Sequence, residues 1–153
     1  MHLMHNPINH PARSTYRVLA GLVGLYLLVF GGIGVATTGG DGLFAQEAGR
    51  ALGQGTNLAN SLLSIVLGAI VLIAAIVGRN IDVTVNRLVS YLLMALGLLT
   101  LALLQTDANF LGHTLASTIV MMMLGLGLLL AGMYGRVGSD EEHDAWQKAR
   151  LEF

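Results

Sequence analysis

The segment 114–134, TLASTIVMMMLGLGLLLAGMY, constrains the fold of this chain more than any other. It contains twenty-one residues and no charged side chain. An uncharged apolar run of about 18 or more residues is typical of a transmembrane helix. At about 1.5 Å of rise per residue, this run is long enough to cross a hydrocarbon core of roughly 30 Å. Three similar runs precede it, so the sequence predicts four membrane spans, at 18–36, 58–77, 88–104 and 114–134.

Composition supports this prediction and excludes several functions. Hydrophobic residues make up 54% of the 153 residues and charged residues only 11%, whereas soluble domains carry about 25% charged residues. Four spans use most of this length, which leaves no room for a separate soluble domain. The net charge of −1 and the lack of a long basic run argue against nucleic acid as a partner. The lack of cysteine excludes disulfides and thiolate-bound metal.

The predicted fold class is all-α. We expect a polytopic membrane protein whose four transmembrane helices form two tandem hairpins, followed by a short C-terminal helix at the membrane interface. Three regions follow from this architecture: an N-terminal cytoplasmic tail at 1–13, a four-helix transmembrane domain at 14–136, and a C-terminal cytoplasmic amphipathic helix at 137–153.

Local signals describe the N-terminal tail. Pro7 and Pro11 disfavour helix within it, and Ser14 or Thr15 is the expected N-cap of the first long helix. Three histidines in this tail match no metal-binding spacing, and their role stays open: His2, His5 and His10.

Two further helices are expected outside the spans. The long connector at 37–57 contains an amphipathic stretch at 43–52 that predicts a short interfacial helix. In the C-terminal region, Ser139 and Glu142 have the spacing of a capping box. The helix that follows carries Trp146 on an apolar face, which is expected at the depth of the lipid headgroups.

The distribution of basic residues predicts the orientation in the membrane. Seven Lys and Arg residues lie in the two tails and in the turn between the second and third spans, whereas the other two connectors contain only Arg50. The positive-inside rule therefore places both termini in the cytoplasm of a multi-pass plasma-membrane protein. The seven residues are Arg13, Arg17, Arg79, Arg87, Arg136, Lys148 and Arg150.

The two halves of the chain share a pattern. The sequence YRVLAGLVGLYLL from Tyr16 parallels NRLVSYLLMALGL from Asn86, and LGAIVLIAAIVGR, which ends at Arg79, parallels LGLGLLLAGMYGR, which ends at Arg136. We expect a duplicated hairpin with an axis along the membrane normal, unlike the inverted repeats common in transporters. Small residues are expected to let the helices approach closely. They are Ala20, Gly24, Ser64, Gly68, Ala74, Gly78, Gly127, Ala131 and Gly135.

Catalytic and cofactor chemistry has little support in the sequence. No Asp, Glu, Lys or Arg lies inside a predicted span, so no buried carboxylate favours proton-coupled transport. His113 is the only histidine near a span, which leaves no pair of axial haem ligands. No nucleophile–base pair or phosphate loop has a recognised spacing. We therefore predict that the chain is not an enzyme and binds no cofactor or metal.

Polar side chains gather at the predicted outer ends of the second and fourth spans. In a duplicated hairpin these ends are equivalent, so the side chains are able to converge. Two interpretations stay open: the groups cap helix ends and satisfy backbone groups, or they form a shallow outward-facing site for a small polar ligand or a lipid headgroup. The cluster comprises Asn57, Asn60, Ser61, Ser64, Asp107, Asn109 and His113.

Several segments resemble a family of small four-helix membrane proteins from actinobacteria that is catalogued as a domain of unknown function. They are GLVGLYLLVFGGIGV, LFAQ, SIVLGAIVLIAAIVGRNID, LLQTDANFLG and LLLAGMYGRVG, and the resemblance covers roughly residues 16–138. The resemblance implies a four-helix integral fold in the plasma membrane. It implies no activity, so it assigns no functional residues.

These observations favour a non-catalytic accessory subunit of a larger plasma-membrane complex. The expected partners are membrane lipids and other membrane-protein subunits, and an actinobacterial respiratory assembly with a terminal oxidase is the first host to consider. The alternative is a self-contained homo-oligomeric transporter, channel, or small-ligand or lipid binder, which requires polar residues along one continuous face. A lipid-modifying enzyme that uses Asp107 and His113 ranks below both.

Overall fold

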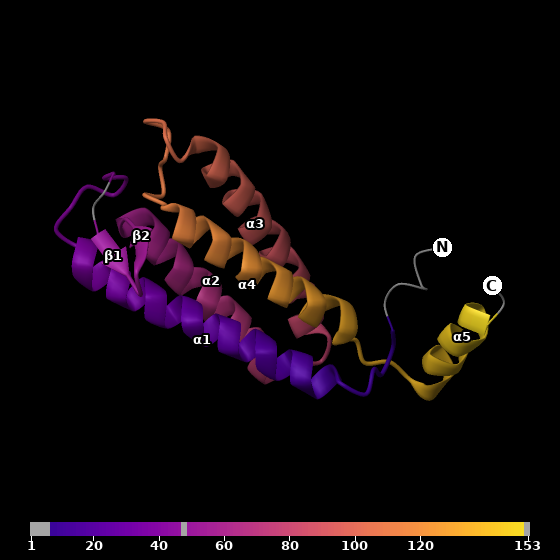
Figure 1. The fold of residues 1–153 in the computed structure, drawn as a ribbon. Helices are drawn as coiled ribbons and strands as arrows, with labels where there is room; N and C mark the ends of the chain where they lie inside the picture. Colours follow the sequence, from indigo (N-terminus) through magenta and orange to yellow (C-terminus); the bar gives the residue numbers. More distant parts are fainter. Residues whose placement is uncertain (1–6, 47–48, 152–153) are drawn as a thin grey trace.

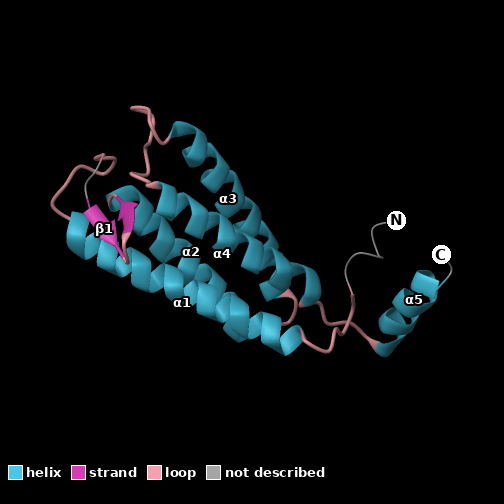
Figure 2. Cartoon of the chain, viewed as in Figure 1, coloured by secondary structure: helices cyan, strands magenta, loops and turns pink. Residues whose placement is uncertain are grey.

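The computed structural model describes residues 7–46 and 49–151, which form five helices and one small sheet (Figure 1). The four long helices lie side by side as a bundle, and the fifth lies apart from it (Figure 2). The predicted all-α class is confirmed, with the sheet as a small addition. The helices are α1 (Arg13–Thr38), α2 (Leu58–Val77), α3 (Ile81–Leu103), α4 (Leu115–Tyr134) and α5 (Asp140–Leu151), and the strands are β1 (Gly49–Ala51) and β2 (Gln54–Thr56).

Each of α1 to α4 is long and apolar enough to cross a membrane. Large aliphatic side chains point outward along all four helices, whereas hydroxyl groups such as those of Ser61, Ser90 and Thr118 are fully buried. A bundle in lipid has this distribution because its surroundings are as apolar as its own side chains, so helices associate through small and polar residues.

The bundle has two distinct ends. The β end carries β1 and β2, together with the starts of α2 and α4, and the terminal end carries the start of α1 and the end of α4 (Figure 1). Five of the arginines counted above lie at or next to the terminal end, and Arg50 lies at the β end. The five are Arg13, Arg17, Arg79, Arg87 and Arg136.

Two helix starts differ from the predicted ones. α1 begins at Arg13 after Ala12, which makes no side-chain capping bond, so neither Ser14 nor Thr15 is the N-cap. α3 begins at Ile81 rather than at 88, because the turn from α2 needs only three residues. Three successive residues with positive φ make this sharp turn: Gly78, Arg79 and Asn80.

The prediction of a short helix at 43–52 is wrong. Residues 42–46 form turns, and 49–56 fold into an antiparallel β-hairpin in which Arg50 pairs with Gly55. Leu52 and Gly53 both have positive φ, 50° and 79°. Two adjacent left-handed residues are what a two-residue β-hairpin turn requires, because their twist matches that of the strands. The turn residues therefore override the helical pattern of the side chains.

The long helices pair as α1 with α2 and α3 with α4. In the first pair the backbones touch: a Cβ atom on Gly68 would lie 2.7 Å from the carbonyl oxygen of Gly24 and 2.8 Å from the amide nitrogen of Leu28. Only glycine fits such an approach. Four other predicted packing residues are also buried in the bundle: Ala20, Ser64, Ala74 and Ala131.

Gly127 does not lie at a close contact between helices, although it was predicted to be a packing residue. A Cβ atom there would meet only a methyl group of Val23, at 4.0 Å. The close approaches of α4 to α3 occur instead at Gly125 and Gly132, which face a different side of the helix. The two remaining predicted glycines act at helix ends, because Gly78 and Gly135 are the C-caps of α2 and α4.

The two helix hairpins repeat the same packing. Arg17 Nε donates to the carbonyl oxygen of Ala75, and Arg87 Nε donates to that of Gly132 at 2.7 Å. The arginines are 70 positions apart and the acceptors 57, the offsets of the repeat predicted from the sequence. Each guanidinium satisfies a carbonyl in the last turn of its partner helix, where the helix itself has no donor.

Burial follows the same repeat. Every buried residue of α4 lies 57 positions after a buried residue of α2, from Ser117 after Asn60 to Gly132 after Ala75. Residues at equivalent places therefore have equivalent surroundings, and the cavity described below lies between these equivalent faces.

The C-terminal region is attached to the N-terminal tail. The predicted capping box is confirmed, because Ser139 Oγ accepts from the amide of Glu142, and a carboxylate oxygen of Glu142 accepts from the amide of Ser139 at 3.1 Å. The side chain of Asn9 bonds the backbone of Gly138 in both directions, at 2.9 and 3.2 Å. Of the three tail histidines, only His10 is described, and its ring lies 5.2 Å from that of Tyr134.

Candidate functional site

The polar cluster begins at the N-caps of α2 and α4, which are equivalent residues. Asn57 Oδ1 accepts from the amide of Asn60 at 3.0 Å, and Thr114 Oγ1 accepts from the amide of Ser117 at 3.4 Å. These bonds satisfy amides in the first helical turn that have no partner within the helix. This part of the cluster therefore has the structural role that one of the two interpretations predicts.

The two helix hairpins also bond each other at the β end. The amide nitrogen of the Asn57 side chain donates to the carbonyl oxygen of Phe110 at 2.9 Å, in the loop before α4. In the other direction, Ser117 Oγ donates to the carbonyl oxygen of Gly55 at 2.7 Å, and the backbone amide of Gly55 donates to Thr114 Oγ1 at 3.2 Å. Each start of a helix is thus held by the loop of the other hairpin, which fixes the side chains between them.

The structure brings together six of the seven predicted cluster residues. Asp107 is the exception: its side chain is exposed on the α3–α4 loop, and its backbone carbonyl accepts from the side chain of Gln46 at 2.6 Å. A carboxylate with no partner is costly to bury, so it stays in contact with solvent. The buried six are Asn57, Asn60, Ser61, Ser64, Asn109 and His113.

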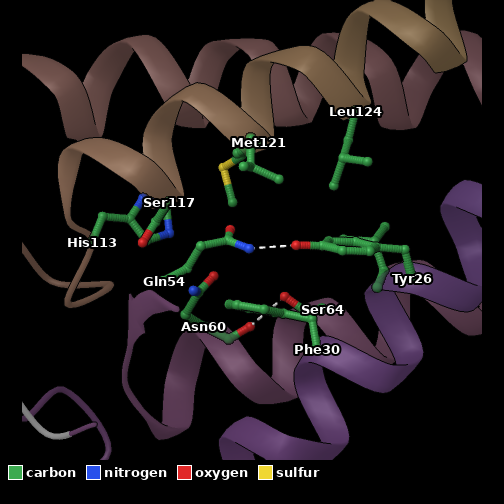
Figure 3. A pocket seen from close by; sticks show the side chains of 11 residues that line it. Tyr26, Phe30, Gln54, Asn60, Ser64, His113, Ser117, Met121 and Leu124 are labelled. Carbon is green, nitrogen blue, oxygen red and sulfur yellow. Dashed lines mark hydrogen bonds between the residues drawn. The ribbon is translucent and has the colours of Figure 1, made fainter. Parts of the chain in front are cut away.

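A small cavity lies beneath the caps, between the two helix hairpins and β2 (Figure 3). Its free volume is about 20 Å³, enough for about one water molecule. Asn60 and Ser64 reach it from α2, and Ser117 and Met121 reach it from the equivalent positions of α4. The remaining lining residues are Tyr26, Leu27, Phe30, Gln54, His113, Val120 and Leu124.

Gln54 and Tyr26 form a polar bridge at one side of this cavity. The amide nitrogen of Gln54 donates to the hydroxyl oxygen of Tyr26 (Figure 3). Because the Tyr26 oxygen accepts in this bond, its own hydrogen stays available for another acceptor.

The hydrogen-bond partners of His113 favour one of its two tautomers. This side chain is 4% exposed, and its Nδ1 lies 2.9 Å from Thr100 Oγ1. The Thr100 hydroxyl donates its single hydrogen to the helix, to the carbonyl oxygen of Leu96 at 2.8 Å. With the Thr100 hydrogen on the Leu96 carbonyl oxygen, Nδ1 carries the hydrogen of the imidazole and donates it to Thr100, and Nε2 is then an acceptor.

The charge state of His113 is set by burial, which lowers its pKa from 6.5 to about 4. The ring is therefore neutral at pH 7. Its Nε2 atom is buried and makes no hydrogen bond with any residue in 7–46 or 49–151.

Asn60 supplies a second buried acceptor. It is 1% exposed, and its side-chain nitrogen donates to Thr56 Oγ1 at 3.1 Å. Its Oδ1 atom has no hydrogen-bond partner among the described residues. The nearby hydroxyls of Ser64 and Ser117 use their hydrogens on backbone carbonyls, at 2.8 and 2.7 Å. The cavity thus presents several acceptors, and two of them are unsatisfied by the described residues.

Sequence reasoning identified Asn60, Ser64 and His113 but missed the other lining residues. The repeat itself was a usable signal for two of them, because Ser117 and Met121 follow Asn60 and Ser64 by 57 positions. No such signal points to Gln54, which reaches the cavity only because residues 49–56 form a β-hairpin.

Metal binding finds no support in the part of the chain that the structure describes, where no three His, Asp or Glu side chains gather as a metal site would require. His2 and His5 lie outside the described residues.

Comparisons with known proteins add no further assignment. No protein-family model, no curated protein and no solved structure matches this chain. The resemblance to an actinobacterial family of four-helix proteins therefore stays a prediction.

Proposed function

We propose that this chain is a non-catalytic accessory subunit of a larger plasma-membrane assembly, and that a respiratory assembly with a terminal oxidase is the first host to test. In this proposal α1 to α4 cross the membrane and both termini lie in the cytoplasm. The grouping of five arginines near the terminal end supports that orientation under the positive-inside rule.

The observation that carries the proposal is the apolar core at the centre of the bundle. Val71, Leu93 and Leu128 are at most 1% exposed and come from three different helices. The polar groups of the cavity stop short of this layer, so no continuous polar face connects the two ends among the residues that the structure describes. A water-filled path through a single copy would have to displace this layer, whereas a subunit that contributes only packing needs no path.

The small-residue seams bear on how a partner would be contacted. Gly24 and Gly68 are used within the chain itself, where the α1 and α2 backbones touch. Contacts with another subunit would therefore use the large aliphatic side chains on the outside of the bundle. Along α1 these form one stripe: Val18, Leu22, Leu25, Val29 and Ile33.

A self-contained small-ligand binder is the second candidate function, and the cavity between Asn60 and His113 is the observation that favours it. Of the alternatives to an accessory subunit, it is the one that does not require a path across the apolar core. A homo-oligomeric transporter or channel would have to place its path between copies of the chain.

Purification from native membranes in a mild detergent tests the proposal. The chain would carry a tag at its C-terminus, and an unrelated four-span protein of the same host with the same tag would serve as the control. We expect stoichiometric membrane subunits that are absent from the control, identified by mass spectrometry. A haem absorption spectrum in the eluate would support a respiratory host. Elution of the chain alone, or only with copies of itself, under several mild detergents would reject the accessory role.

A further inference from the structure

We propose that the cavity binds one small hydrogen-bond donor of about the size of a water molecule, held between Asn60 Oδ1 and His113 Nε2. The first residue belongs to the α1–α2 hairpin and the second to the loop that enters α4, so the bound molecule joins the two halves of the bundle. This inference does not depend on the proposed role as an accessory subunit.

The requirement for a donor follows from where the hydrogens of the cavity residues are used. In the favoured tautomer His113 donates its single ring hydrogen to Thr100, and the Asn60 amide donates one of its hydrogens to Thr56. The hydroxyl hydrogens of Ser64 and Ser117 go to backbone carbonyls. Apart from the second amide hydrogen of Asn60, these groups present lone pairs to a molecule in the cavity, so a ligand that donates hydrogen bonds gains more from them than one that only accepts.

Burial makes an unsatisfied state of these acceptors costly. Asn60 and His113 are 1% and 4% exposed, and both line the same cavity. Nearly all buried polar atoms in native proteins have a partner, in the protein or in ordered water. In the proposed site, a single molecule with two hydrogens supplies the missing partner of both acceptors.

The size of the cavity limits the ligand. A free volume of about 20 Å³ accommodates about one water molecule. Such a molecule has two hydrogens to donate to Asn60 Oδ1 and His113 Nε2, and its oxygen is able to accept a third hydrogen bond. Three hydrogen bonds are typical of a buried water.

Ammonium has the same donor chemistry and nearly the same size as water, but it carries a charge. No Asp or Glu lines the cavity among the described residues, and an unpaired buried charge is much more costly than a neutral polar group. The electrostatics therefore favour the neutral donor, and the experiment must distinguish the two.

Nuclear magnetic resonance of the full chain in detergent, with ¹⁵N-labelled histidine, tests the donor site directly. The His113 signals are assigned with His113→Gln. We expect a protonated Nδ1, an unprotonated Nε2 shifted by hydrogen bonding, and magnetisation transfer between the ring and a long-lived water. A protonated Nε2 in the neutral ring would overturn the proposal, and this measurement on the unmodified protein needs no stable variant.

Two matched variants localise the effect. Asn60→Leu removes the acceptor at nearly constant volume, and Asn86→Leu is the control. Asn86 is also 1% exposed, and its Oδ1 atom has no partner among the described residues, but it does not line the cavity. The water contact of His113 should disappear only in Asn60→Leu.

Ammonium is tested by the melting temperature in ammonium chloride against equal sodium chloride. An ammonium-specific increase that Asn60→Leu abolishes and Asn86→Leu retains identifies the charged donor, whereas a flat series with the water contact present identifies water. A flat series without a water contact at His113 would refute the site.

Discussion

Acid should destabilise the bundle through His113. Burial lowers the pKa of this residue to about 4, whereas the unfolded chain has the ordinary value of about 6.5. Between these two pH values the unfolded chain binds more protons than the folded one, so unfolding becomes more favourable as the pH falls. The stabilising effect is complete above the unfolded pKa and is lost progressively as the pH falls towards 4.

The size of this effect follows from the gap between the two pKa values. At about 1.36 kcal/mol per pH unit, protonation of His113 changes the free energy of unfolding by about 3 kcal/mol in total. Between pH 7.5 and pH 4.5 the expected loss is about 2.5 kcal/mol. This is a large part of the roughly 5–15 kcal/mol that stabilises a typical folded protein.

Reversible unfolding in mixed detergent micelles, followed by far-ultraviolet circular dichroism, measures this loss. His113→Gln is the reference, because glutamine does not titrate and every other ionisable group is shared by the two proteins. The difference between the two pH profiles should be about 2.5 kcal/mol over this interval. Profiles that run parallel to within about 0.5 kcal/mol would refute the assignment of a buried neutral histidine.

Three further predictions concern packing and capping. Gly31→Ala should destabilise the bundle by about 1–3 kcal/mol, because its Cβ would lie 2.5 Å from the Ser61 carbonyl oxygen. The control is the adjacent Gly32→Ala, whose Cβ would meet no atom within 4 Å and which should be neutral or stabilise by up to about 1 kcal/mol. Equal effects of the two variants on detergent unfolding would contradict the close approach at Gly31. Arg17→Met and Arg87→Met should each cost about 1–2 kcal/mol, with additive effects in the double variant because the two bonds lie in different hairpins; strong coupling would argue against independent caps. Asn57→Ala should cost about 1 kcal/mol through the lost N-cap of α2, measured as a reduced melting temperature, and an unchanged value would show that the cap does not stabilise the helix.

The four long helices were predictable because their signal is long and uniform. Each is an apolar run of sufficient length, and a helix satisfies the backbone hydrogen bonds of such a segment within itself, as lipid requires. The start of α3 was not predictable in the same way, since 81–87 contains Asp82 and Arg87, which resemble the residues of an exposed turn. Arg87 is accommodated in the helix because a carbonyl of α4 accepts from it.

The candidate site was predictable only in part, for a related reason. Polar residues at the starts of α2 and α4 stand out against apolar sequence, and the repeat places them at one end. Two outcomes depend on contacts that no local pattern encodes. Asp107 stays exposed because no residue in 7–46 or 49–151 pairs with its carboxylate, and Gln54 reaches the cavity because the turn at Leu52 and Gly53 forms a β-hairpin rather than the predicted helix.

The repeat also explains why the cavity has its particular chemistry. Equivalent residues agree where the helices pack, as Gly68 and Gly125 do, but they differ around the cavity, where Asn60 is equivalent to Ser117 and Ser64 to Met121. A symmetric pair of serines would place two short hydroxyls there, each able to bond its own helix. The longer amide of Asn60 instead places an oxygen in the cavity that no described residue satisfies.

The difference between Asn60 and Ser117 predicts the effect of a single substitution on the water contact of His113. Asn60→Ser makes positions 60 and 117 identical, so the fold and the far-ultraviolet spectrum should be retained. The variant loses the second acceptor, however, and a serine hydroxyl in α2 is able to bond the carbonyl four residues earlier. The water contact of His113 should therefore weaken or disappear in an otherwise intact bundle. If Asn60→Ser keeps that contact unchanged, the difference between the halves has no role in binding, and His113 alone would hold the donor.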